Sequence, residues 1–154
     1  MNPDYILIFL LFILLSPQML VSLPAFKSGA LLSKDVAEVS KTSALVHAII
    51  FIILHHYLGK SIMRAMGLIP ASESTTPKSL VGIMDLVCGT LFFLLTPGVL
   101  LTLPPVSMSI PSSSNDVLCT HKTTIPAVVV HAAVFVLAHH YVVQIMHAYG
   151  VGEP

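Results

Sequence analysis

The sequence has 154 residues, of which 55% are apolar and 9% are charged, and its mean hydropathy is +0.91. About a quarter of the residues in a soluble domain carry a charge, so seven cations and seven anions are too few to cover such a surface, and the composition predicts an integral membrane protein. The net charge is zero and the sequence has no basic run, which excludes the positive surface that nucleic-acid binding requires.

Four segments approach the roughly 20 apolar residues that a membrane-spanning helix needs. In chain order they are Tyr5–Phe26, Ala44–Leu58, Met84–Leu103 and Ile125–Met146. The first has neither the positively charged n-region nor the cleavage site of a signal peptide, so we expect it to be retained as an anchor. The Lys and Arg residues divide almost evenly between the two sides of this arrangement and do not predict its orientation.

The two halves of the chain repeat one pattern. The matched segments are Phe12–Pro17 with Phe92–Pro97, Leu20–Pro24 with Leu100–Pro104, Val46–Ala48 with Val130–Ala132, Leu54–Tyr57 with Ala138–Tyr141, and Ile62–Gly67 with Ile145–Gly150. Each half holds two spans, so it returns the chain to its starting side and the second copy enters with the orientation of the first. We therefore predict an all-α fold of four transmembrane helices, arranged as two parallel tandem hairpins at residues 1–75 and 76–154 of one membrane domain. A four-helix bundle is the simplest closure; the alternative is two hairpins that each pack on other proteins.

A serine or threonine followed by proline interrupts the first span of each repeat. A proline inside a helix removes one backbone hydrogen bond, and a Ser/Thr-Pro pair is also typical of a helix start. Each of these two spans is therefore predicted to be an apolar helix, a break, and a short segment that ends at a second proline. Such breaks can form a gate or an ion site, but we favour a device that bends the helix near one membrane face. The residues concerned are Ser16, Pro17, Pro24, Thr96, Pro97 and Pro104.

Histidines recur at the same places in both repeats. On a helix, His47 and His55 fall on one stripe and His56 points the other way, and the second copy repeats the pattern. Neutral imidazoles bind haem and metals, so a haem held by histidines is one alternative. The spacing within each stripe corresponds to a rise of about 12 Å, which fits one residue near each membrane interface better than one compact site. We expect no cofactor or metal; if haem were bound, the ligands would be His47, His55, His131 and His139.

Asp85 is the only acidic residue within a predicted span. It could relay protons or ions, lie at headgroup level, or pair with a neighbouring helix. We favour the last two because Tyr5 occupies the equivalent position in the first repeat. The sequence has no GxSxG, HExxH or phosphate-loop motif, and we expect that the chain is not an enzyme.

Two further features concern how the spans are held. Lys27–Ser43 places apolar residues on one helical face and charges elsewhere, which is typical of a helix lying in the membrane interface and equally of a helix that docks on a partner. Small residues within the spans favour close helix packing; they are Gly89, Ala132, Ala133 and Ala138.

The run Leu95–Pro105, followed by Val130–Phe135, resembles small hydrophobic proteins of large double-stranded DNA viruses, notably the algal giant viruses. In that group an S/T-P-G-x-L-L-T-L-P-P segment precedes a V-H-A-x-x-F span. The first repeat departs from this pattern, because Gln18 replaces the glycine and Ala25 replaces the second proline. The resemblance implies a virion protein of the inner membrane that ties the bilayer to the capsid shell.

These observations together predict a multi-pass structural protein of a virion inner membrane. Its partners would be the lipid bilayer and other membrane or capsid proteins of a large assembly. The alternatives are a haem or metal subunit of a membrane electron-transfer complex, with histidine ligands, and a small proton or ion pathway that uses Asp85 and the broken spans.

Overall fold

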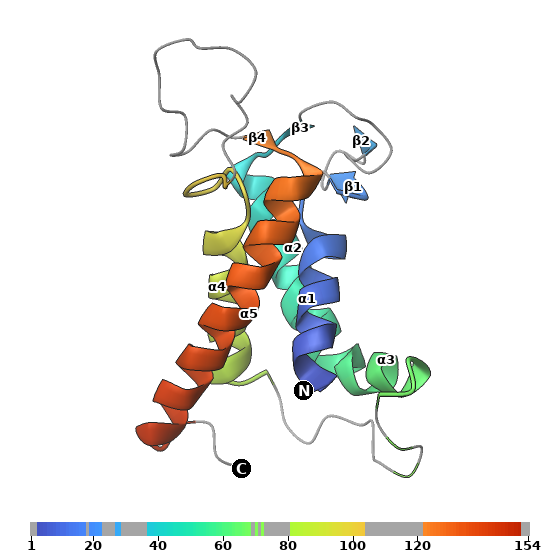
Figure 1. Cartoon of the computed structure of the whole chain (residues 1–154), viewed down its shortest axis with the longest axis vertical. Coiled ribbons are helices and arrows are strands. Elements are labelled where there is room, and N and C mark those ends of the chain that lie inside the picture. Colours follow the sequence, from blue (N-terminus) through green and yellow to red (C-terminus); the bar gives the residue numbers. More distant parts are fainter. Residues whose placement is uncertain are drawn as a thin grey trace.

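Four apolar helices lie side by side along the length of the molecule (Figure 1). In this computed structural model they are α1 (Pro3–Leu15), α2 (Lys41–Ile53), α4 (Ile83–Leu95) and α5 (Ile125–Ala148). A π-helical turn, η1 (Leu54–Leu58), continues α2, and the short α3 (Gly59–Ala65) follows it. The structure describes residues 3–17, 19–22, 27–28, 37–68, 70, 72, 81–103 and 122–151.

Two short antiparallel strand pairs accompany the helices. β1 (Val21–Ser22) pairs with β2 (Lys27–Ser28), and β3 (Ala37–Glu38) pairs with β4 (Lys122–Thr123). The second pair joins the chain just ahead of α2 to the chain just ahead of α5, so it links the starts of two helices that lie far apart in the sequence.

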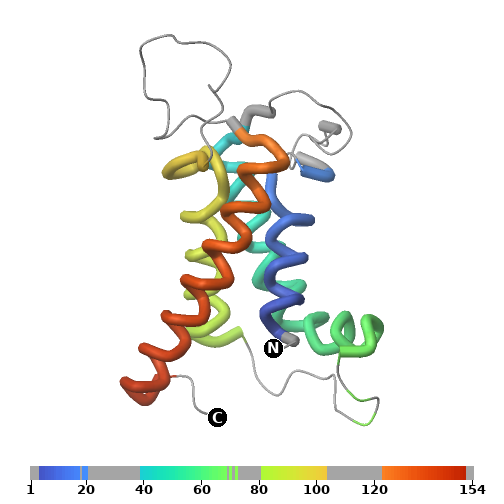
Figure 2. The backbone as a smooth tube through the Cα atoms, viewed as in Figure 1, coloured from blue at the N-terminus to red at the C-terminus, as the bar shows by residue number. Residues whose placement is uncertain are grey.

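The helices form a ring in which every neighbour is antiparallel (Figure 2). α1 packs against α2 and α5, and α4 packs against the same two helices. Helices α1 and α4 stop, and α2 and α5 start, at what we call the upper end of the bundle (Figure 1). At the opposite, lower end, α1 starts and α5 stops. The hairpins α1–α2 and α4–α5 therefore enter the bundle in the same direction. They pack against each other along two interfaces, α1 with α5 and α2 with α4.

Four phenylalanines, one from each helix, fill the middle of the bundle. Each is fully buried, and the rings of each hairpin contact those of the other, at centroid distances of 4.9 Å for Phe12–Phe135 and 4.8 Å for Phe51–Phe92. Phe12 matches Phe92 in the repeat, and Phe51 matches Phe135. The phenylalanine layer therefore consists of matching positions from the two halves. Its members are Phe12, Phe51, Phe92 and Phe135.

The ends of α2 and α5 are also set by matching residues. Ser40 caps α2 by accepting a hydrogen bond from Ser43 N at 3.3 Å, and Thr124 caps α5 by accepting one from Ala127 N at the same distance. At the other end, Gly67 and Gly150 follow α3 and α5 with φ values of 71° and 70°. Glycine adopts this left-handed conformation without a steric penalty, so both helical segments stop there.

Close contact between α2 and α4 depends on Gly89. This residue is buried, and a Cβ atom added to it would lie 2.3 Å from Ile52 Cδ1, so no larger residue fits without a shift. Ala132 is also fully buried, whereas Ala133 is exposed. The small residues named from the sequence therefore have different surroundings.

Two helical stretches, Lys41–Ala65 and Ile125–Ala148, are long and apolar enough to cross a membrane; Asp4–Leu15 and Ile83–Leu95 are apolar but shorter. The helices begin near the predicted span boundaries, but α1 and α4 end at Leu15 and Leu95, directly before the Ser/Thr-Pro pairs. Among the described residues that follow each proline, 19–22 and 98–103, no helix restarts. Proline therefore ends the helix where the sequence suggested a break, and Pro24 and Pro104 lie outside the described residues.

The interfacial helix predicted for Lys27–Ser43 is wrong for most of its described residues. Residues 27–28 and 37–38 pair as strands, and the extended Ser40 is the N-cap of α2, which begins at Lys41. Hydrogen bonds between paired strands replace the helix there. The local periodicity of a sequence does not show which other segments of the chain will pair with it. The centre of the stretch, 29–36, lies outside the described residues.

Candidate functional site

At the upper end, two hydroxyl groups bind back onto the helices that stop there. Ser16 Oγ donates to Phe12 O, and Thr96 Oγ1 donates to Phe92 O, each at 2.7 Å. Both hydroxyl-bearing residues are buried, at 1% exposure. The proline that follows each of them has no N–H to donate, so nearby side chains must satisfy the carbonyls at the helix end.

Two matching histidines supply the next hydrogen bonds. His47 Nδ1 lies 2.7 Å from Leu15 O, and His131 Nδ1 lies 2.6 Å from Leu95 O. A carbonyl only accepts, so each Nδ1 carries the hydrogen and donates it. Each histidine therefore closes the upper end of its own hairpin by capping the helix that comes before it. We call His47 and His131 the capping histidines.

His131 is held by a second hydrogen bond. Leu103 N donates to His131 Nε2 at 3.0 Å, so both ring nitrogens are engaged and the ring is neutral in this arrangement. A haem iron would need the Nε2 lone pair that Leu103 N–H occupies. The interior between the capping histidines and the lower end is filled by the phenylalanine layer. In the described part of the chain, no group of three or more His, Cys, Asp or Glu side chains is placed to hold a metal ion.

At the lower end, one carboxylate faces two histidines. His56 Nδ1 lies 2.9 Å from Asp85 Oδ2, and His55 Nδ1 lies 3.9 Å from Asp85 Oδ1. Gly82 N also donates to Asp85 Oδ2 at 2.9 Å, so the carboxylate caps the start of α4 as well. Asp85 thus pairs with a neighbouring helix, which was one of the roles considered from the sequence.

The prediction that His56 points away from His55 is wrong. Both residues lie in η1, whose hydrogen bonds run from i to i+5 rather than i to i+4. A wider turn contains more residues, so consecutive side chains are separated by a smaller angle and both imidazoles reach Asp85. The matching stretch in α5 stays α-helical.

The second repeat makes the corresponding contact with a different partner. Tyr5 Oη lies 2.6 Å from His140 Nδ1, and Gln144 Nε2 lies 3.1 Å from His140 Nε2. Tyr5 matches Asp85 in the repeat, and His140 matches His56. We call His56–Asp85 the acid clasp and Tyr5–His140 the phenol clasp; each fastens one hairpin to the other.

The remaining histidines of the two His-His pairs face the bundle interior. The ring of His55 stacks on Phe51 at 5.7 Å, and the ring of His139 lies 6.3 Å from that of Phe135. The Nδ1 atoms of both are buried and have no hydrogen-bond partner in the described structure. The histidines proposed as haem ligands are therefore divided between the two ends of the bundle.

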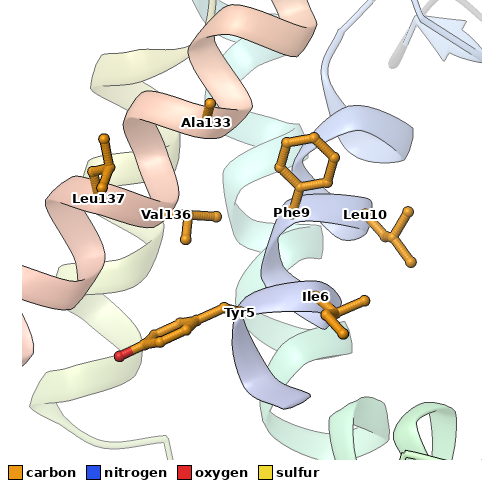
Figure 3. A pocket seen from close by; sticks show the side chains of 7 residues that line it. All are labelled: Tyr5, Ile6, Phe9, Leu10, Ala133, Val136 and Leu137. Carbon is orange, nitrogen blue, oxygen red and sulfur yellow. The ribbon is translucent and has the colours of Figure 1, made fainter. Parts of the chain in front are cut away.

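An apolar groove runs between α1 and α5 (Figure 3). Its volume is about 470 Å³, and it is lined by Tyr5, Ile6, Phe9, Leu10, Ala133, Val136 and Leu137. In Figure 3 the Tyr5 ring extends from α1 toward α5, which places its hydroxyl group at the edge of the groove. The phenol clasp therefore borders this groove.

No family model matches the chain, and neither a curated protein nor a solved structure matches it.

Sequence reasoning overlooked Tyr5 and His140 as partners. The signal was present, since Tyr5 stands at the Asp85 position and His140 stands at the His56 position. If equivalent positions of the two repeats are expected to make equivalent contacts, a contact between His56 and Asp85 predicts one between His140 and Tyr5.

Proposed function

We propose that the chain is a structural integral membrane protein whose four bundle helices cross the bilayer as two consecutive hairpins. Its partners would be lipid and other proteins of a large assembly. On the sequence resemblance, we further propose that this assembly is a virion and that the chain links its inner membrane to the capsid shell.

The observation that carries the membrane assignment is the apolar outer surface of all four helices. Large hydrophobic residues on the helices are 46% exposed at Leu14, 50% at Ile49, 56% at Leu86 and 59% at Leu137. A water-soluble bundle buries its apolar stripe and covers the outside with charge. Here the outside is apolar as well, and lipid is the solvent that such a surface needs.

The capping histidines support the same proposal. Backbone that leaves a helix at membrane depth must be satisfied by protein, because the hydrocarbon offers no hydrogen bonds. The carbonyls of Leu15 and Leu95 have partners in His47 and His131. The two shorter helices can thus stop at membrane depth and still be compatible with lipid.

A structural role is supported by what occupies the interior. The phenylalanine layer and the capping histidines use the central space for packing and for satisfying the backbone. The bundle therefore resembles a rigid anchor, to which partners would bind through exposed helix faces and loops.

The four-span arrangement is tested by labelling single cysteines in sealed vesicles with a membrane-impermeant maleimide. In a background without Cys88 and Cys119, Ser72→Cys and Tyr149→Cys should react from one side, and Ser40→Cys and Leu103→Cys from the other. These four residues are exposed in the structure. If only the two longer helices crossed, Ser72→Cys would instead share a side with Leu103→Cys, which would contradict the proposal.

The virion assignment has a separate test. Mass spectrometry of purified particles from infected host cells that express the chain should detect it in the membrane-containing fraction. Its absence from particles would remove the viral part of the proposal and leave the membrane part unaffected. A Soret band in the purified protein that is lost in His47→Ala would instead establish the haem alternative.

A further inference from the structure

The lower end of the bundle gathers ionisable side chains from every element that meets there. They include Asp4 and Tyr5 of α1, His55 and His56 of η1, Lys60 and Arg64 of α3, Asp85 and Cys88 of α4, and His139 and His140 of α5. At the upper end, the buried ionisable side chains of the described residues are the two capping histidines, which are committed to backbone groups. Any response of the bundle interior to protons is therefore expected at the lower end.

An ionised Asp85 carries a negative charge that a neutral His56 does not compensate, so it can stabilise a positive charge on a neighbouring histidine. Its Oδ2 atom already binds His56 Nδ1, while its Oδ1 atom faces His55 Nδ1 at 3.9 Å. That His55 atom is buried and has no hydrogen-bond partner. Protonated histidine carries a hydrogen on both ring nitrogens, so a proton on His55 would turn this orphaned atom into a donor aimed at a carboxylate oxygen.

Added protons are expected to weaken the phenol clasp rather than strengthen it. An amide nitrogen can only donate, so Gln144 Nε2 donates to His140 Nε2, and His140 Nδ1 then donates to Tyr5 Oη. A proton added to His140 would occupy the nitrogen that accepts from Gln144. The partner in this clasp is an uncharged phenol, which does not compensate the added charge as a carboxylate does.

His139 limits how many protons the lower end can hold. Its own Nδ1 atom is buried without a partner, and a positive charge on His55 acts unfavourably on it. Two like charges at close range repel, so a proton on His55 disfavours a second proton on His139. The carboxylate of Asp85 lies beside His55 and His56.

The phenylalanine layer closes the route above the acid clasp. His55 stacks on Phe51, and Phe51 contacts Phe92 and Phe135, each of which is fully buried. A chain of proton carriers needs polar groups or water, and these rings supply neither. The lower end is thus a closed site rather than half of a transmembrane path.

We propose that His55, His56 and Asp85 form a proton-binding site that fastens the first hairpin to the second more tightly in acid. The bond is made across the α2–α4 interface, where the two hairpins interlock. This inference concerns contacts inside the bundle and holds in detergent or in lipid, so it can fail while the membrane assignment stands.

The experiment follows thermal unfolding of the full chain in detergent at pH 8 and pH 5.5, on either side of the ordinary histidine value near 6.5. Asp85→Asn keeps the shape of the side chain and an acceptor for Gly82 N. On acidification, the midpoint of the wild-type protein should rise by about 2–4 °C relative to that variant. His147→Gln, a change at an exposed residue of α5, should respond as the wild-type protein does. An equal response of Asp85→Asn and wild type would overturn the proposal.

Two further measurements keep the inference testable if Asp85→Asn fails to fold. In the wild-type chain labelled with ¹⁵N-histidine, the imidazole signals lost in His55→Gln or His56→Gln should titrate between pH 8 and pH 5. Constant signals from both residues would refute a proton-binding site. In liposomes the wild-type protein should conduct no more protons than empty vesicles, and a proton flux that Asp85→Asn abolishes would contradict the closed site.

Discussion

The strongest test of the fold is the replacement of a capping histidine by a ring that cannot form hydrogen bonds. His131→Phe keeps an aromatic ring in the buried site and removes the hydrogen bonds to Leu95 O and Leu103 N. A buried polar group left without a partner costs about 1–3 kcal/mol. The side chain of Leu103 is 38% exposed, so water can replace part of the second loss. We therefore expect a loss of about 2–4 kcal/mol in the free energy of unfolding.

For a chain of this size, each kcal/mol shifts the unfolding midpoint by about 2–4 °C, so the midpoint should fall by roughly 4–16 °C. Circular dichroism at the helix band during heating in detergent measures this shift. His147→Phe makes the same replacement at an exposed site of α5 and should stay within about 0.5 kcal/mol of the wild-type protein. His47→Phe should weaken the bundle as His131→Phe does. A midpoint for His131→Phe indistinguishable from that of His147→Phe would show that the capping bonds do not hold the hairpin.

Three other replacements test the bundle interior by the same unfolding measurement. Phe135→Ala removes a fully buried ring that contacts three others and should cost about 3–5 kcal/mol; a loss below 1 kcal/mol would mean that the phenylalanine layer is loosely packed. Gly89→Val places a side chain against Ile52 and should cost about 1–3 kcal/mol, and a stabilised variant would contradict the close α2–α4 approach. Tyr5→Phe removes the phenol clasp alone and should cost about 1 kcal/mol, whereas no change in the midpoint would deny the clasp a role.

The positions of the helices could be predicted from the sequence because they depend on local composition. Apolar runs marked the helices, and Ser16-Pro17 and Thr96-Pro97 marked the places where α1 and α4 end. That the helices end there rather than bend could not be predicted, since a proline permits either outcome. The decision depends on what accepts or donates hydrogen bonds at the freed backbone groups.

The functions of the histidines could be predicted only in part. Periodicity placed His47 on one helical face, but its partner Leu15 belongs to another helix, and periodicity within α2 does not say how near that helix lies. The π-helical turn at His55 and His56 departs from the regular periodicity of an α-helix. The sequence thus drew attention to these residues, while their contacts required the folded chain.

The unequal clasps show what a tandem chain allows. Two identical hairpins that assembled as separate molecules would present the same residue at both symmetry-related positions, so they would carry either two acids or two phenols there. In one polypeptide the two positions need not match, and here Asp85 and Tyr5 stand at equivalent places in the repeat. Fusion of the two copies therefore permits a chemical polarity, one face charged and the other neutral, that no twofold homodimer can have.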